Sequence, residues 1–208
     1  MTRAIRIYVE GGGNESSKAN LREGFNQFLQ TVRDRARSSK LRWQVVPSGS
    51  REDTYKAFRA GLSSHAEDQV LLLVDSEGEV TGSPIEHLCG KGKGGWDREL
   101  LSDENCHLMV QLMEAWFIAD VEKLAEFYGQ GFRESAIPRT KDVEKVDKKR
   151  VLDSLTKATA NTSKRAYDKK RDRHASELLR CIRPEKVRQK SRHCARLFTA
   201  LEKLVTTA

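Results

Sequence analysis

Two short apolar segments of this 208-residue chain run directly into acidic residues. The first segment, residues 5–9 (IRIYV), is followed by Glu10, and the second, residues 70–74 (VLLLV), is followed by Asp75 and Glu77. Short runs of β-branched residues and leucine that stop at acidic residues and glycine are typical of buried parallel strands. In open α/β sheets, ligands bind beyond the carboxyl ends of the strands. We therefore expect the three carboxylates to converge if the two strands are neighbours.

The segments around these strands predict an α/β fold. Apolar residues recur at helical spacing over 18–37, and a second strand is indicated over 41–46. Ser50 followed by Asp53 resembles a capping box and predicts the start of another helix before the strand at 70–74. The order β-α-β-α-β indicates a mostly parallel sheet with right-handed crossovers, flanked by helices.

The remainder of the chain predicts a long loop and then a helical half. Residues 78–105 are rich in Gly, Asp, Lys and Ser, and we expect a long mobile loop there, close to the acidic edge. A fourth strand is indicated over 107–112 and a helical start over 113–120. Short basic helices are predicted at 146–158, 175–182 and 191–205. We expect an α/β domain at 1–128 and a basic helical extension, packed on it, at 129–208.

Charge is distributed unevenly along the chain, whose net formal charge is +8. Residues 1–138 contain 17 Lys and Arg against 21 Asp and Glu, a balance of −4, whereas residues 139–208 contain 21 against 9, a balance of +12. Such asymmetry points toward a nucleic-acid partner. The alternative is that the basic half consists of solvated helix faces, and the sequence leaves both interpretations open.

The composition of the chain bears on membrane contact, on cellular compartment and on the state of the cysteines. No run approaches the roughly 20 apolar residues that span a bilayer, and the start leads straight into a strand, so we expect a cytoplasmic protein without membrane contact. The four cysteines are widely spaced, which favours reduced thiols. His87, Cys89, Cys106 and His107 could form a zinc set, but buried cysteines and incidental histidines are the favoured interpretation.

The acidic residues have the chemistry of a Mg²⁺ or Mn²⁺ site. Asp75 and Glu77 lie two residues apart, so at a strand end both side chains would point the same way. Mg²⁺ binds through a few carboxylates and takes phosphate oxygens as further ligands. Glu10 could complete the site or transfer a proton. Gly11, Gly12 and Gly13 would let a phosphate approach the backbone. An ATP-binding P-loop is rejected because the Gly-Lys-Ser/Thr ending is missing.

Two further groups of residues are candidates. Glu114 projects from a largely apolar helix face, where it would cap the helix, pair with an arginine or act in the site as a further metal ligand. The densest basic cluster lies at 164–174, and a tyrosine within it could stack on a base while cations contact phosphates. Its alternative is a solvated loop. The phosphate-binding candidates of this cluster are Lys164, Tyr167, Lys169, Lys170 and His174.

The strand-end motifs resemble the TOPRIM fold of topoisomerases, bacterial primases, OLD-type nucleases and small ribosomal-RNA maturases. In that fold a Glu follows the first strand and an Asp-x-Asp follows a later one, and together they bind Mg²⁺. The wider chain resembles a bacterial family of unknown function with a TOPRIM-like core, the domain-of-unknown-function family numbered four-two-seven-six. The supporting segments are 7–11 (IYVEG), 73–78 (LVDSEG), 113–120 (MEAWFIAD) and 167–169 (YDK).

The resemblance implies that Glu10, Asp75 and Glu77 hold the metal and act in catalysis, with Glu77 in place of the usual second Asp. It implies Mg²⁺- or Mn²⁺-dependent hydrolysis of DNA or RNA, and by analogy a role in phage defence, sometimes beside an ATPase partner. Two alternatives stay open at this point. The protein could bind nucleic acid or a nucleotide without cutting it, or it could be an effector held by an ATPase.

Overall fold

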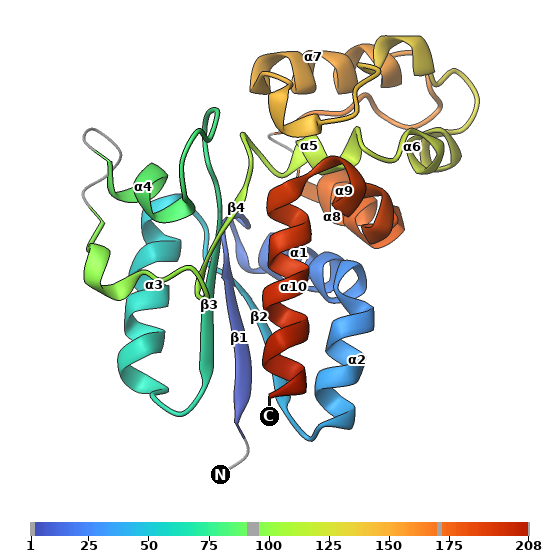
Figure 1. Ribbon diagram of the computed structural model, residues 1–208. Coiled ribbons are helices and arrows are strands. Elements are labelled where there is room, and N and C mark those ends of the chain that lie inside the picture. Colours follow the sequence, from blue (N-terminus) through green and yellow to red (C-terminus); the bar gives the residue numbers. More distant parts are fainter. Residues whose placement is uncertain (1–2, 91–95, 170–171, 208) are drawn as a thin grey trace.

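The computed structural model describes residues 3–90, 96–169 and 172–207, and it contains a sheet of four parallel strands in the order β2-β1-β3-β4 (Figure 1). The expected α/β class, with a parallel sheet flanked by helices, is therefore confirmed. The strands are β1 Ala4–Val9, β2 Arg42–Pro47, β3 Gln69–Asp75 and β4 Cys106–Met109.

Alternating side chains of the central strands enter two separate apolar cores. On one face, Ile7 and Val9 of β1 pack with Leu71 and Leu73 of β3. On the other face, Tyr8 of β1 packs with the intervening residues of β3. This period of two is the pleat of a strand whose two faces are both covered, and it explains why β1 and β3 appear in the sequence as continuous apolar runs.

Helices cover both faces of the sheet (Figure 1). The first core lies under α1, α2 and α10, and α8 packs on α1. The second core lies under α3 and α4. Their bounds are α1 Glu15–Phe28, α2 Gln30–Ser38, α3 Arg51–Ser64, α4 Pro84–Cys89, α8 Asp172–Cys181 and α10 Arg192–Thr206.

The chain beyond β4 is helical and lies above the carboxyl edge of the sheet before returning through α10 (Figure 1). Its apolar residues belong to the same core as α1 and β1, so the expected extension at 129–208 does not have a separate core within the described residues. The elements are α5 Glu114–Phe117, α6 Val121–Tyr128, α7 Lys148–Thr159 and α9 Pro184–Lys190, with 3₁₀ turns at Arg98–Leu100, Glu134–Ala136 and Val143–Lys145.

Two local expectations are wrong. The single helix expected over 18–37 begins earlier, capped by Asn14, and is interrupted at Leu29, whose backbone leaves the helical conformation at φ −96° and ψ 15°. The long loop expected at 78–105 instead contains α4, which begins with a complete capping box formed by Ser83 and Glu86. Trp96 of the same segment is buried against the second core, where its ring stacks on Tyr55 at a centroid distance of 4.2 Å.

The strand order places a topological switch point between β1 and β3. The chain moves from β1 outward to β2, returns to β3 on the other side of β1, and continues to β4. Neighbouring connections therefore leave the β1–β3 boundary in opposite directions, and ligand sites of open α/β sheets form at the carboxyl ends of such strands. Among the residues described, no helix combines the length and apolar character needed to cross a bilayer.

Candidate metal centre

Glu10 and Asp75 lie side by side at this switch point. Asp75 is the last residue of β3, and Glu10 directly follows β1, whose Val9 pairs with Leu73. Two hydrogen bonds fix the arrangement: Glu10 N donates to Leu73 O at 3.0 Å, and Asp75 N donates to the Glu10 carboxylate at 3.0 Å. The parallel pairing of the two strands thus aligns both acidic side chains at one edge of the sheet.

Glu77 joins them through a strained turn. Its backbone has φ +62°, a left-handed conformation that non-glycine residues adopt at a cost of about 1 kcal/mol. The turn is held by hydrogen bonds from Ser76 N to Met109 O and from Glu77 N to Gln111 O, both 3.0 Å. One carboxylate oxygen from each of Glu10, Asp75 and Glu77 lies within 4.8 Å of the others.

Over the described ranges, 3–90, 96–169 and 172–207, this is the one group of three or more His, Cys, Asp or Glu side chains close enough to share a cation. The zinc set considered for His87, Cys89, Cys106 and His107 is therefore not assembled. His87 Nε2 instead lies 2.7 Å from Ser76 O, and burial raises the pKa of the Cys106 thiol to about 12. Both histidines are buried, and His107 Nε2 lies 3.1 Å from Glu104 O. The interpretation of a buried thiol holds for Cys106, whereas Cys89 is only partly buried.

Glu114 faces the same site from the start of α5. Its Oε1 accepts a hydrogen bond of 2.9 Å from the Tyr167 hydroxyl, and its Oε2 has no hydrogen-bond partner among the described residues. The side chain is only 4% exposed, and it lines a cavity of about 140 Å³ together with Glu10, Asp75 and Lys169. A buried carboxylate oxygen without a donor is costly, so the cavity offers a place where a ligand would be stabilised.

Three basic side chains surround the carboxylates. Lys169 Nζ lies 3.5 Å from Asp75 Oδ2 and 3.8 Å from Glu114 Oε2. Lys148 Nζ forms an ion pair of 2.8 Å with Glu77. Arg51, at the start of α3, donates from Nη1 to the backbone carbonyl of Asp75 at 3.2 Å. The centre is therefore a mixed cluster in which cations neutralise part of the charge of the acids.

The pKa values reflect crowding and burial. Burial raises the pKa of Asp75 well above its usual range, and the charges of Glu10 and Glu114 raise it further. Burial also raises the pKa of Glu10 to about 6, although the hydrogen bond from Asp75 opposes the rise. Burial alone would raise the pKa of Glu77, but the hydrogen bond and charge of Lys148, together with the charges of Lys169 and Arg51, outweigh it and the pKa is lowered. Burial and crowding therefore disfavour the charged forms of Asp75 and Glu10, and a bound cation would favour them.

The backbone conformation of the loop beside Glu10 requires glycine at two positions. Gly11 has φ +124° and Gly12 has φ +82°. A Cβ at Gly11 would lie 2.6 Å from the Leu21 side chain, and one at Gly12 would lie 2.7 Å from Lys18. Gly13, by contrast, has open space where a Cβ would be. Gly11 and Gly12 line the cavity, and phosphate binding by this loop stays a prediction.

The expected phosphate-binding residues do not gather at one place. Lys169 reaches the carboxylates, whereas Lys164 lies over the Phe127 ring at 4.3 Å and His174 packs against Phe127 and Tyr128 on α6. Burial lowers the pKa of His174. Lys170 lies outside the described residues.

The expectation that Tyr167 stacks on a base is wrong, because its ring is buried at 2% exposure and its hydroxyl is bound to Glu114. Tyr167 instead positions Glu114 through this hydrogen bond. The hydrogen bond also anchors the chain two residues before Lys169, so that the ammonium group is held near the carboxylates.

Sequence reasoning missed Arg51 and Lys148. Arg51 lies under the buried Trp96 ring, 5.0 Å from its centroid, and its Nη2 atom is buried without a hydrogen-bond partner among the described residues. A signal for Arg51 existed, because a basic residue that starts a helix just after β2 must lie at the same edge of the sheet. No comparable signal marks Lys148, which reaches Glu77 from α7, 71 positions away in the sequence.

Fold and site together define an α/β protein with an oxygen-rich cluster at the carboxyl edge of a parallel sheet. Comparison with known families identifies the group to which it belongs. The sequence model described as a domain of unknown function (DUF4276) matches residues 9–202, and the chain is a member of this family. Searches of curated proteins and of solved structures found no match.

Proposed function

We propose that this protein hydrolyses phosphodiester bonds of DNA or RNA with the help of Mg²⁺ or Mn²⁺. The observation that supports the proposal is the convergence of Glu10, Asp75 and Glu77 within 4.8 Å, beside a buried Glu114 oxygen that lacks a donor among the described residues. The positions of the acids after β1 and β3 agree with the arrangement that the TOPRIM resemblance implies. A TOPRIM-like core is part of this proposal.

The donor set fits a hard divalent cation. Glu10, Asp75 and Glu77 offer only carboxylate oxygens, which suit Mg²⁺ and Mn²⁺ better than metals that prefer nitrogen or sulfur. A cation bound there would neutralise charge on a phosphoryl oxygen and lower the pKa of water. Glu114 would bind the cation directly, or its Oε2 atom would orient another ligand of the cation.

The protein's own residues would hold the substrate and move the proton. Asp75 is fixed by the hydrogen bond that its Oδ1 accepts from Met113 N at 2.9 Å, which aims Oδ2 at the cavity. Glu10 uses one oxygen for Asp75 N, which leaves the other to accept a proton from water. Lys169 would contact a phosphate oxygen, because its ammonium group lies at the cavity rim and its side chain is 45% exposed.

The test is a cleavage assay on labelled single-stranded and duplex DNA and RNA with Mg²⁺ or Mn²⁺. Wild type should cleave at least one substrate, and Asp75→Ala should lose at least about a thousandfold of the rate. Glu23→Gln, which removes an exposed acid on α1, is the matched control and should cleave normally. Cleavage that survives Asp75→Ala unchanged would rule out this mechanism.

A nucleic-acid binding protein without hydrolytic activity is the second candidate. It is favoured by the ion pairs of Lys148 with Glu77 and of Lys169 with Asp75, which already neutralise part of the cluster. In that case Asp75→Ala would leave the affinity for nucleic acid unchanged or raise it, since the substitution removes negative charge close to the bound phosphates. A salt titration of binding, with cleavage measured in parallel, separates the two candidates.

A further inference from the structure

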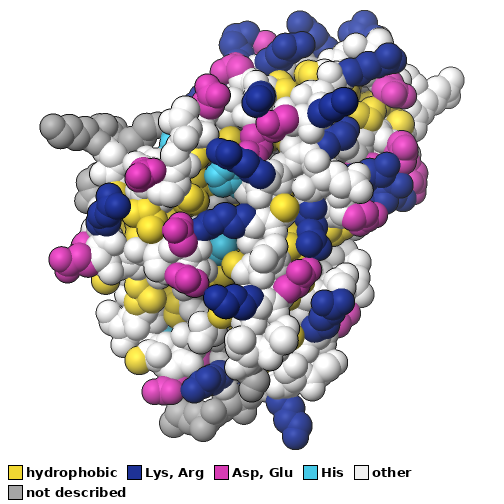
Figure 2. Space-filling model, viewed as in Figure 1, with side chains coloured by type: hydrophobic (Ala, Val, Ile, Leu, Met, Phe, Trp, Pro, Cys, Tyr) yellow, Lys and Arg dark blue, Asp and Glu magenta, His cyan; other side chains and the backbone are white. Residues whose placement is uncertain are grey.

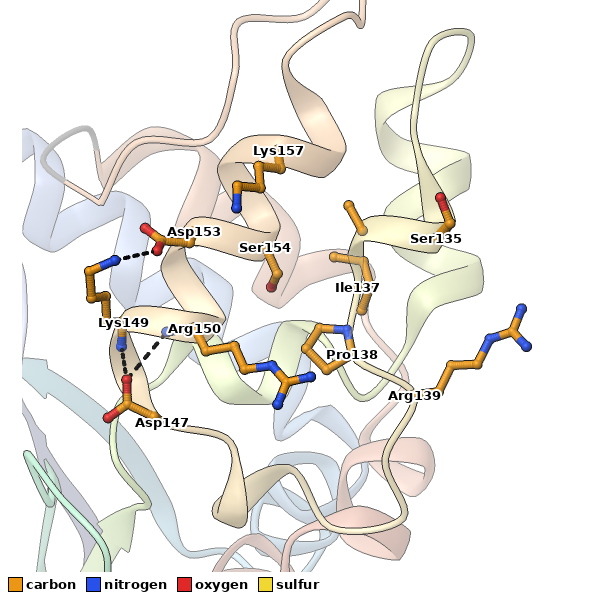
Figure 3. A pocket seen from close by; sticks show the side chains of 11 residues that line it. Ser135, Ile137, Pro138, Arg139, Asp147, Lys149, Arg150, Asp153, Ser154 and Lys157 are labelled. Atoms are coloured by element: carbon orange, nitrogen blue, oxygen red, sulfur yellow. Dashed lines mark hydrogen bonds and ion pairs between the residues drawn. The ribbon is translucent and has the colours of Figure 1, made fainter.

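A charged groove lies beside α7, the helix whose Lys148 reaches the candidate metal centre. It has a volume of about 600 Å³ and lies between α7 and the segment around Pro138 (Figure 3). Ile137 and Pro138 provide an apolar part of its surface, and Arg150 extends across it from α7 (Figure 3). The lining also includes Ser135, Arg139, Asp147, Lys149, Asp153, Ser154 and Lys157.

The groove has a surplus of positive charge, because four cations and two acids line it. Its two acids are already engaged: Asp153 pairs with Lys149 at 2.6 Å, and Asp147 caps α7 by accepting from two backbone N–H groups at 2.9 and 3.3 Å. The exposed cations Arg139, Arg150 and Lys157 form no ion pair within the described part of the chain. Figure 2 shows Lys and Arg side chains gathered at the top of the molecule, where α7 lies.

The first turn of α7 connects this groove to the carboxylates. Asp147 and Lys149 line the groove, and the residue between them, Lys148, reaches Glu77 at 2.8 Å. A chain of phosphates that leaves the acidic cluster past Lys148 would therefore enter the groove within one helical turn. Because Asp147 occupies the N–H groups at the helix start, anion recognition here depends on the side chains of Arg139, Arg150 and Lys157.

We propose that the α7 groove binds the sugar–phosphate backbone of the nucleic-acid strand whose reacting phosphate lies at Glu10, Asp75 and Glu77. The inference rests on the proposed function and deepens it. The cations match the phosphates, and the partly exposed ring of Pro138 matches the face of a sugar or base. The main phosphate contacts would then be made by Arg139, Arg150 and Lys157 and not by the cluster at 164–174.

The test measures binding without cleavage. Fluorescence anisotropy of a labelled oligonucleotide, single-stranded or duplex, is recorded with EDTA over a series of salt concentrations. The groove variant combines Arg139→Gln, Arg150→Gln and Lys157→Gln. The control variant combines Arg35→Gln, Arg37→Gln and Lys203→Gln, which remove the same charge from exposed positions on α2 and α10. Thermal unfolding verifies that each variant is folded.

The groove variant should bind at least about tenfold more weakly than the control at low salt. Its slope of log K against log salt should fall by about two for a single strand, since each of three lost contacts contributes about 0.7. If the triple variant does not fold, Arg150→Gln alone should reduce the slope by about 0.7. Equal affinity and slope in the groove and control variants would overturn the proposal, as would equally tight binding of polyglutamate.

The same preparations separate this inference from the proposed function. Wild type that binds through the groove but never cleaves with Mg²⁺ or Mn²⁺ would support the groove and overturn the hydrolase. Wild type that cleaves, while the groove variant binds like the control, would overturn the groove alone.

Discussion

The molecule contains two kinds of buried carboxylate, and the contrast between them indicates which one is built for a ligand. Asp120 and Glu144 lie where loops meet helices of the second half, while Asp75 and Glu114 lie at the carboxyl edge of the sheet. All four residues are at most 6% exposed. They differ in how completely the protein itself satisfies their oxygens.

Asp120 and Glu144 have donors for both oxygens. Asp120 accepts three hydrogen bonds of 2.6 to 2.9 Å from the backbone and guanidinium of Arg183. Glu144 accepts from the Ser191 hydroxyl at 2.6 Å and from His193 N at 2.8 Å, and its other oxygen lies 2.8 Å from His193 Nδ1. Burial alone would raise both pKa values, but these hydrogen bonds outweigh it and both are lowered. Such carboxylates stabilise the fold.

The sheet-edge carboxylates are more crowded and, at Glu114, less completely satisfied, although Asp75 has Met113 N and Lys169 as partners. Asp75 lies beside Glu10 and has its pKa raised by burial and by neighbouring acids, and Glu114 retains an oxygen without a donor among the described residues. The turn that brings Glu77 toward them is strained. Unsatisfied, crowded and strained groups concentrate at functional sites. The comparison therefore separates structural acids from candidate ligands without reference to any relative.

The largest stability effect should come from breaking a satisfied carboxylate. Glu144→Ala removes the acceptor for Ser191 and for two groups of His193, and it should lower the free energy of unfolding by about 3 kcal/mol. Chemical denaturation at pH 7 measures the change. Glu185→Ala, on the exposed face of α9, is the control and should change it by less than about 0.5 kcal/mol. Similar losses in both variants would remove the contrast.

Glu10→Gln should raise the free energy of unfolding of the metal-free protein, the opposite of the effect expected for Glu144→Ala. The folded pKa of about 6 exceeds the ordinary value of 4.5, so the folded state binds the proton more tightly, and Glu10 destabilises the fold as pH rises from 4.5 through about 6. Below pH 4.5 the stability of the variant and of wild type should depend on pH in the same way. Between pH 4.5 and pH 7 the variant should gain about 2 kcal/mol in free energy of unfolding relative to wild type.

Unfolding curves with EDTA across this pH range test the expectation. The amide oxygen of the introduced glutamine can still accept the hydrogen bond from Asp75 N, so the variant removes charge and keeps the contact. A stability difference that does not change with pH would show that burial of Glu10 is not what separates the two kinds of acid.

The smallest effect is expected at the hydrogen bond between Tyr167 and Glu114. Tyr167→Phe keeps the buried ring and removes the donor, so it should lower the free energy of unfolding by about 1 kcal/mol. Cleavage should also fall, because Glu114 loses the contact that orients it. A loss as large as that of Glu144→Ala would place Glu114 among the structural acids.

The sequence was sufficient to predict the sheet and its acidic edge. Two buried strands appear as apolar runs of the correct length, and the acids that end them must lie at the same edge once the strands are parallel neighbours. Glu10 and Asp75 were therefore predictable from local pattern alone. Leu29 was not, because apolar residues keep their helical spacing through the break between α1 and α2.

Contacts that depend on the tertiary path could not be predicted. Nothing in the sequence near Lys148 shows that α7 lies above Glu77, and the basic cluster at 164–174 divides between Lys169 at the site and His174 at α6. Tyr167 lies among charged residues, yet its ring is buried. A run of charged residues shows only which side chains are present, whereas the direction in which each one points depends on the packing around it.

The most direct test of the central claim is thermal unfolding of wild type and Asp75→Asn during titration with Mn²⁺ or Mg²⁺. The cation should stabilise wild type by about 2.7 kcal/mol at about a hundred times its dissociation constant, and Asp75→Asn should show little change. Glu23→Gln should respond like wild type. Equal stabilisation of wild type and Asp75→Asn, or no response of wild type at millimolar cation, would contradict a metal centre at Glu10, Asp75 and Glu77.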